Sequence, residues 1–146
     1  MKPTNLTIEV IDQIERHYLI ETNSSRDVNL CFVHKKPLTT SQINVCILAR
    51  KQAEVKLNAT AKIEPTAQGS NARLNILAVT TDQAHITAAP NLEINNFQVK
   101  AGHALTTVHI DDSQLFYLTS RGISLTQARK LAIDGIVKPY LDGVRL

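Results

Sequence analysis

Regular alternation of apolar and polar residues is the feature that most constrains this chain. Between Val55 and Ile63 every second residue is apolar, and the residues between them are Lys, Asn and Thr. Side chains two residues apart point to the same face of a β-strand, so this stretch predicts a strand with one buried and one wet face. A chain built from such strands must bury each apolar face against another layer.

Eight further short stretches predict strands, and residues typical of turns separate them. The nine predicted strands are Leu6–Ile11, His17–Glu21, Val28–His34, Ile43–Ala49, Val55–Ile63, Arg73–Val79, Ala84–Thr87, Leu92–Val99 and Leu105–Ile110. Turns are expected at Asn23–Ser25, Lys36–Pro37, Pro65–Asn71, Ala89–Asn91 and Asn95–Asn96. This spacing is typical of a sandwich, a barrel or a β-solenoid. Asn-Gly and Asp-Gly hairpin signals are missing from the strand region, which favours the gently turning solenoid.

Composition narrows the function classes. The 146 residues are 43% hydrophobic and 20% charged, which is typical of one folded domain. The net charge is only +3 and the chain contains no Trp. It therefore has neither a strongly basic surface nor a set of aromatic side chains for stacking on bases, and no nucleic-acid partner is expected. No membrane-spanning run and no secretory leader are visible, and a cytoplasmic protein is expected. Cys31 and Cys46 are then two reduced thiols.

The periodicity changes after residue 110, so we divide the chain into a β domain, 1–110, and a helical segment, 111–146. Asp111–Gln114 and Ser124–Gln127 have the form of capping boxes and predict two successive helix starts. The expected apolar faces are Leu115, Phe116 and Leu118 on the first helix, and Leu125, Ala128, Leu131 and Ala132 on the second. The second helix has too few basic residues to read DNA.

Four short motifs in the second half of the chain carry a family resemblance. They are Pro90–Glu93, His103, Gln114–Tyr117 and Arg121–Ser124. In order and spacing they resemble the C-terminal core of the SufB/SufD family, the scaffold proteins of iron–sulfur cluster assembly. The resemblance covers about residues 40–140, while residues 1–40 are poorly recognisable. It implies a short right-handed parallel β-helix ending in a helix–turn–helix, and the chain looks like a short, stand-alone member.

The resemblance also implies a function. The chain would be a non-enzymatic scaffold that pairs with a SufB/SufD-type subunit, or with a second copy of itself, and docks an ABC-type ATPase. His103 would lie at the junction of two scaffold subunits, where a cluster forms. The partner-binding residues would be Leu115, Phe116, Tyr117, Leu118, Arg121 and Gly122. Pairing is expected near His103 and Leu105–Ile110.

Several ligands of the family's assembly site are missing. Asn75 or a neighbour stands where the cluster-building subunit has a cysteine, and Ala104 stands where it has a glutamate. We therefore expect no stably bound cofactor and at most a transient iron–sulfur cluster, with neither the two cysteines nor the pair His103 and His109 forming a metal site. His17, His34 and His85 are expected at the surface or at strand ends. The alternatives are a truncated, self-associating paralogue without assembly activity, and a carbohydrate-active β-helix.

Overall fold

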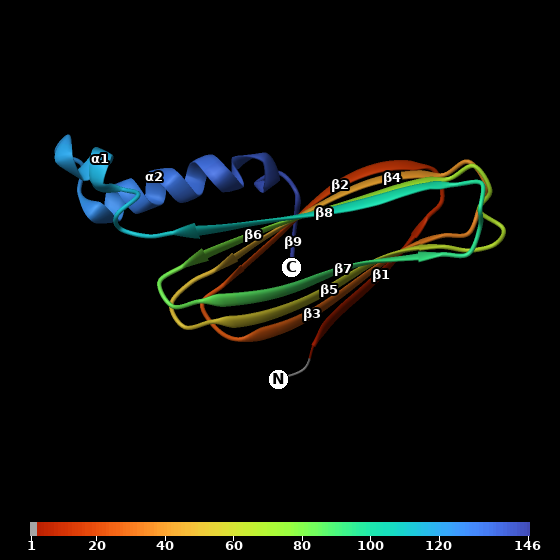
Figure 1. Ribbon diagram of the computed structural model, residues 1–146, viewed down its shortest axis with the longest axis horizontal. Coiled ribbons are helices and arrows are strands. Elements are labelled where there is room, and N and C mark those ends of the chain that lie inside the picture. The colour runs from red at the N-terminus through yellow and green to blue at the C-terminus, as the bar shows by residue number, and fades with distance from the viewer. Residues whose placement is uncertain (1–2) are drawn as a thin grey trace.

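The computed structural model describes residues 3–146, in which two parallel β-sheets face each other and helices cover part of one of them (Figure 1). The strands are β1 (Thr4–Val10), β2 (Gln13–Thr22), β3 (Arg26–His34), β4 (Thr40–Ala49), β5 (Glu54–Ile63), β6 (Asn71–Thr81), β7 (His85–Ile94), β8 (Lys100–Ile110) and β9 (Val144–Arg145). The helices are α1 (Phe116–Ser120), α2 (Leu125–Val137) and the 3₁₀ turn η1 (Lys138–Tyr140). Sheet A has the order β1-β3-β5-β7 and sheet B the order β8-β6-β4-β2-β9.

The chain alternates between the two sheets, and every strand pairing is parallel. Within sheet A, Thr4 pairs with Val28, Arg26 with Val55, and Glu54 with His85. These three offsets of 24, 29 and 31 residues separate four successive coils, each made of one strand from each sheet, and correspond to about three full turns of a solenoid. We call β1 with β2 the first coil and β7 with β8 the last coil. The predicted parallel β-helix is confirmed.

The main core lies between the sheets, where the inward side chains of successive coils stack on one another. One inward row of sheet B runs through Tyr18, Val45, Ile76 and Leu105, which are paired in register. The ring of Tyr18 lies against Phe32 of sheet A, with ring centroids 5.6 Å apart. This burial explains the period-two pattern, because outward residues such as Asn58 meet water while their neighbours meet the opposite sheet.

A second apolar cluster lies on the outer face of sheet B, beneath α2. Its buried residues are Leu19, Cys46, Leu48, Val79, Ile110, Leu115, Ala128, Ile133 and Val137. Since β2, β4, β6 and β8 all contribute, α2 crosses every coil of the solenoid at this face. Figure 1 shows α2 returning along sheet B after β8 and leading into β9.

The prediction of a turn at Ala89–Asn91 was wrong. Residues His85–Ile94 form the single strand β7, in place of the separate strands predicted at Ala84–Thr87 and Leu92–Val99. Pro90 is tolerated within it because β7 is the edge of sheet A, where one missing N–H breaks no ladder. The corner comes later, and the turn predicted at Asn95–Asn96 is confirmed. The last predicted strand begins earlier than expected, at Lys100.

The helix predictions need two corrections. Asp111 caps a tight turn rather than α1, because its Oδ1 accepts from the Gln114 N–H at 2.9 Å while the helix begins only at Phe116. Ser124 caps α2 as predicted, accepting from the Gln127 N–H at 3.2 Å. The buried face of α2 consists of Ala128, Ile133 and Val137, whereas the predicted Leu125 and Leu131 are exposed.

Candidate functional site

The last coil is the least covered part of the solenoid, and His103 lies on it. β7 and β8 are the outermost strands of sheets A and B at this end, and within residues 3–146 each pairs on one side only. His103 and Leu105 occupy inward positions of β8, in register with the buried Leu74 and Ile76 of β6. His103 is nevertheless exposed, because no further coil stacks on it.

Apolar side chains surround this open end. Ile94 is 46% exposed, Leu105 is 41% exposed, and Phe97 projects fully into solvent from the corner between β7 and β8. Exposed strand edges combined with apolar side chains favour pairing with another β structure. We call this surface, formed by β7, β8 and the corner with Phe97, the open end.

The residues beside His103 lack the groups that bind iron tightly. Ala104 pairs in register with Asn75 of β6. Asn75 itself donates from Nδ2 to Oδ1 of Asn44 at 2.9 Å, so its side chain belongs to a hydrogen-bonded ladder on the outer face of sheet B. An imidazole alone does not complete a cluster site.

The two cysteines are free thiols that lie on other strands than His103. Cys46 is fully buried under α2, and this burial raises its pKa to about 12. Cys31 lies on sheet A, where burial and then the neighbouring Glu93 carboxylate raise its pKa. Both thiols therefore remain protonated near neutral pH and are poor metal ligands. Among residues 3–146, no group of three or more His, Cys, Asp or Glu side chains is arranged to hold a metal ion.

The other histidines lie away from His103. His109 is six residues beyond His103 on β8, which is about 20 Å along a strand, and its Nδ1 lies 2.9 Å from the Thr80 hydroxyl. His17 packs edge-on against Tyr140. His34 ends β3, but it is buried rather than at the surface.

The helical segment displays two aromatic side chains. Phe116 is 71% and Tyr117 is 64% exposed, whereas Leu115 is buried and Leu118 is partly buried against sheet B. The Arg121 guanidinium lies 5.1 Å from the centre of the Tyr117 ring. Gly122 ends this turn with a φ of 89°, a left-handed conformation that favours glycine. Of the six predicted docking residues, Leu115 and Leu118 thus hold the turn on the sheet, and the other four are exposed to solvent.

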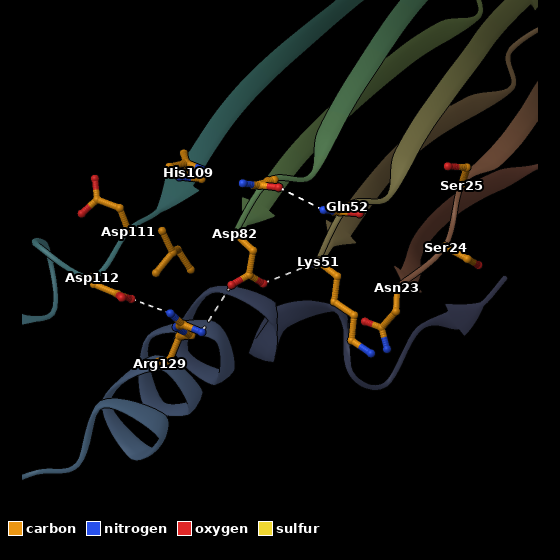
Figure 2. A pocket seen from close by; sticks show the side chains of 12 residues that line it. Asn23, Ser24, Ser25, Lys51, Gln52, Asp82, His109, Asp111, Asp112 and Arg129 are labelled. Carbon is orange, nitrogen blue, oxygen red and sulfur yellow. Dashed lines mark hydrogen bonds and ion pairs between the residues drawn. The ribbon is translucent and has the colours of Figure 1, made fainter.

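A surface cavity of about 910 Å³ lies where the strand turns meet α2 (Figure 2). Arg129 of α2 reaches both Asp82 and Asp112, with nitrogen–oxygen distances of 3.4 and 2.5 Å. Asp82 also accepts from the Lys51 backbone N–H at 3.2 Å. The cavity therefore contains a charge network that connects α2 to the coils, and its lining residues include no nucleophile with an adjacent base.

Hydrogen bonding favours the ionised forms of Asp82 and Asp111. The Lys51 N–H and then the Thr81 hydroxyl lower the pKa of Asp82. The Ser113 hydroxyl and the Gln114 N–H lower the pKa of Asp111 in the same way. The hydrogen bond that Arg129 donates to the Asp112 carboxylate raises the pKa of Arg129. Such shifts favour the charged forms that fix the helix in place.

Comparison with known families decides the identity of the fold. The domain described as "SUF system FeS cluster assembly, SufBD core domain" matches residues 12–136, which is most of the chain. The chain belongs to the SufBD core family. Within residues 3–146, no helix has the length and apolar character needed to cross a bilayer.

Curated relatives carry the same family description. An iron–sulfur cluster assembly SufBD family protein of Synechocystis sp. is 32% identical over 108 residues, which is 73% of this chain and 24% of that protein. Similar proteins of Mycobacterium leprae and Mycobacterium bovis are 45% identical over 84 residues and 53% identical over 58, or 56% and 39% of this chain. The matched segments span 15–24% of the length of these SufBD relatives.

Two features of the SufBD fold were missed from sequence. The Arg129 network joins residues 47 and 17 positions apart, and no local spacing rule connects them. Phe97 was assigned to a strand, although the adjacent Asn95–Asn96 turn signal already indicated a corner where an aromatic side chain becomes exposed.

Proposed function

We propose that this SufBD chain is a non-enzymatic scaffold element that pairs through its open end and docks an ABC-type ATPase through α1. The observation that carries the proposal is the unpaired, partly apolar edge of β8, where His103 and Leu105 are inward in register and exposed to solvent. A second SufBD solenoid, either another copy or a SufB/SufD-type subunit, would continue the sheets and bury these side chains.

His103 would then lie at the junction of two subunits. An exposed neutral imidazole can accept a proton or bind iron weakly while a partner supplies the stronger ligands. This division of labour fits the absence of a thiolate or carboxylate at Asn75 and Ala104. The free thiols Cys31 and Cys46 fit action in a reducing compartment such as the cytoplasm.

The alternative is a self-associating paralogue that no longer supports cluster assembly. The observation that favours it is the same lack of thiolate and carboxylate groups beside His103. The two proposals agree on pairing and differ on the ATPase. Binding of a cognate ATPase therefore separates them.

Pairing is tested by substituting Leu105→Asp. Sedimentation velocity should give a dimer for the wild-type chain and a monomer for the variant, because a buried carboxylate would oppose the new interface. Leu131→Asp is the matched control, since Leu131 is 55% exposed on α2, outside the open end, and should leave the dimer intact. A wild-type monomer at high micromolar concentration contradicts pairing with a second copy.

ATPase docking is tested by Phe116→Asp and Tyr117→Asp. Each should weaken binding of the cognate ATPase about 30-fold, which corresponds to about 2 kcal/mol for the loss of an aromatic anchor. The circular dichroism of the sheets should not change, because neither side chain is part of a buried cluster. Equal binding by wild type, both variants and Leu131→Asp would show that α1 is not the docking site.

A further inference from the structure

The last residues of the chain return to the first coil. β9 pairs in parallel with β2, so that Val144 is opposite Tyr18 and Arg145 is opposite Leu19. The Leu146 N–H donates to the Leu19 carbonyl at 3.1 Å, and the Leu146 side chain packs on the core between the sheets. In Figure 1 the blue end of the ribbon leaves α2 and reaches the strands of sheet B. We call Gly143–Leu146 the closing segment.

Side chains from several elements hold the closing segment in place. Arg26 of β3 donates to the Leu146 carbonyl and to the Thr4 hydroxyl, each at 3.0 Å. Arg145 lies 3.7 Å from a carboxylate oxygen of Glu21 on β2. These contacts connect the segment to β1, β2 and β3, so it is a fitted part of the first coil.

The closing segment lies so close to the backbone of β2 that only glycine fits at position 143. A Cβ on Gly143 would lie 2.3 Å from the backbone oxygen of His17, well inside the contact distance of real side chains. The neighbouring η1 adds Tyr140, which packs edge-on against His17. Backbone contact at this distance cannot relax by a side-chain rotation, so a larger residue must displace the segment.

The two ends of the solenoid differ in how far they are covered. The inward row Tyr18, Val45, Ile76 and Leu105 connects them, and the exposed fractions are 1%, 0%, 2% and 41%. Tyr18 and Leu105 are the two terminal residues of this row, one at each end of the solenoid. Tyr18 is buried because β9 and Leu146 lie against its edge, whereas Leu105 has no following strand.

Without the closing segment, the last coil of one copy could pair with the first coil of another copy. All coils stack in parallel, so the free edge of β8 in one copy has the direction needed to pair with β2 of another, and β7 with β1. Such head-to-tail stacking uses two different surfaces and does not close on itself, and therefore produces filaments. A solenoid with both ends open invites this growth.

We propose that the closing segment is an end cap that keeps a second copy of this chain from stacking onto the first coil. It occupies the Tyr18–Leu19 stretch of the β2 edge that an incoming β8 would need. Association is then directed to the open end, and growth stops after one contact.

The proposal is tested with Gly143→Val and with a chain lacking residues 143–146. Both should form large species whose size increases with protein concentration in sedimentation velocity, whereas the wild-type chain keeps one small size. Gly135→Ala is the matched control, because a Cβ at Gly135 meets no atom within 4 Å and should leave the wild-type size unchanged. If both altered chains keep the wild-type size, the proposal is overturned.

A second substitution separates stacking from misfolding. Filaments that grow head to tail need the opposite end, so adding Leu105→Asp to Gly143→Val should abolish the large species. Aggregates of unfolded chains would persist, and their persistence would also overturn the proposal. The result does not depend on pairing of the wild-type chain, because a wild-type monomer with growing Gly143→Val filaments would still support the cap.

Discussion

His34 shows how one polar residue can be accommodated inside the solenoid. It is fully buried at the end of β3, yet its Nδ1 lies 2.8 Å from the Thr39 hydroxyl and its Nε2 lies 2.8 Å from the Ser41 hydroxyl. A neutral ring satisfies both contacts by donating at one nitrogen and accepting at the other. Burial correspondingly lowers the pKa of His34. The sequence pattern placed this histidine at a strand end but gave no sign of its hydroxyl partners, which come from the following corner at Thr39 and from the start of β4 at Ser41.

Stability should therefore fall in mild acid through His34. Its pKa is lowered in the folded chain, so as pH falls below about 6.5 the unfolded chain binds the proton first and unfolding becomes easier. In urea titrations, His34→Gln should be destabilised by about 1–3 kcal/mol at neutral pH and should lose part of the acid-dependent decrease. His85→Gln, at the exposed start of β7, is the control. Parallel decreases for wild type and His34→Gln would contradict this prediction.

At the scale of elements, the strands were more predictable than the helices. Alternation identified β5 almost residue for residue, because both of its faces have a fixed environment. Pro90 misled the prediction for β7, since a proline signals a turn unless the strand is an edge, and edge position depends on the whole sheet. The predicted face of α2 was right at Ala128 and wrong at Leu125 and Leu131, because the helix is turned so that Ile133 and Val137 meet sheet B instead.

Two glycines of the helical segment should respond in opposite ways to alanine. Gly135 lies within α2 with open space around it, so Gly135→Ala should increase the free energy of unfolding by about 0.5–1 kcal/mol. Gly122 has a φ of 89°, so Gly122→Ala should decrease it by about 1 kcal/mol. Thermal and urea unfolding measure both. Equal effects at the two positions would show that α2 does not contribute to the cooperative fold.

At the scale of the whole molecule, the candidate ligands lie in three separate places. His103 lies at the open end, Cys46 lies beneath α2, and Cys31 lies on sheet A. Sequence spacing suggested that they do not form one site, and the fold gives the reason, since Cys31 is on the other sheet and Cys46, although on sheet B like His103, is covered by α2. The family resemblance already indicated pairing near His103 and Leu105–Ile110, but a physical reason for the proposed pairing required the register, because the alignment of Leu105 with Ile76 places Leu105 at a core position that is exposed.

Reconstitution of the isolated chain with iron and sulfide under anaerobic conditions should therefore give no stoichiometric cluster. After desalting, absorption in the sulfur-to-iron charge-transfer region should return to baseline, because neither thiol is deprotonated near neutral pH. Cys31→Ser and Cys46→Ser serve as controls for weak binding to the thiols. A stoichiometric cluster that survives in both variants would show that other residues form a site.

The crossing of all four coils by α2 also affects how the molecule folds. In a solenoid whose coils contact only their neighbours, the coils can unfold one at a time from either end. Here a single helix packs on Leu19, Cys46, Val79 and Ile110, one residue from each strand β2, β4, β6 and β8. No coil can leave without disturbing a surface that it shares with the others, so the stack should gain and lose its structure as one cooperative unit. This arrangement should slow folding, because the first coils to be synthesised become fully stabilised only through contacts with residues of α2, which lie more than a hundred positions later in the chain.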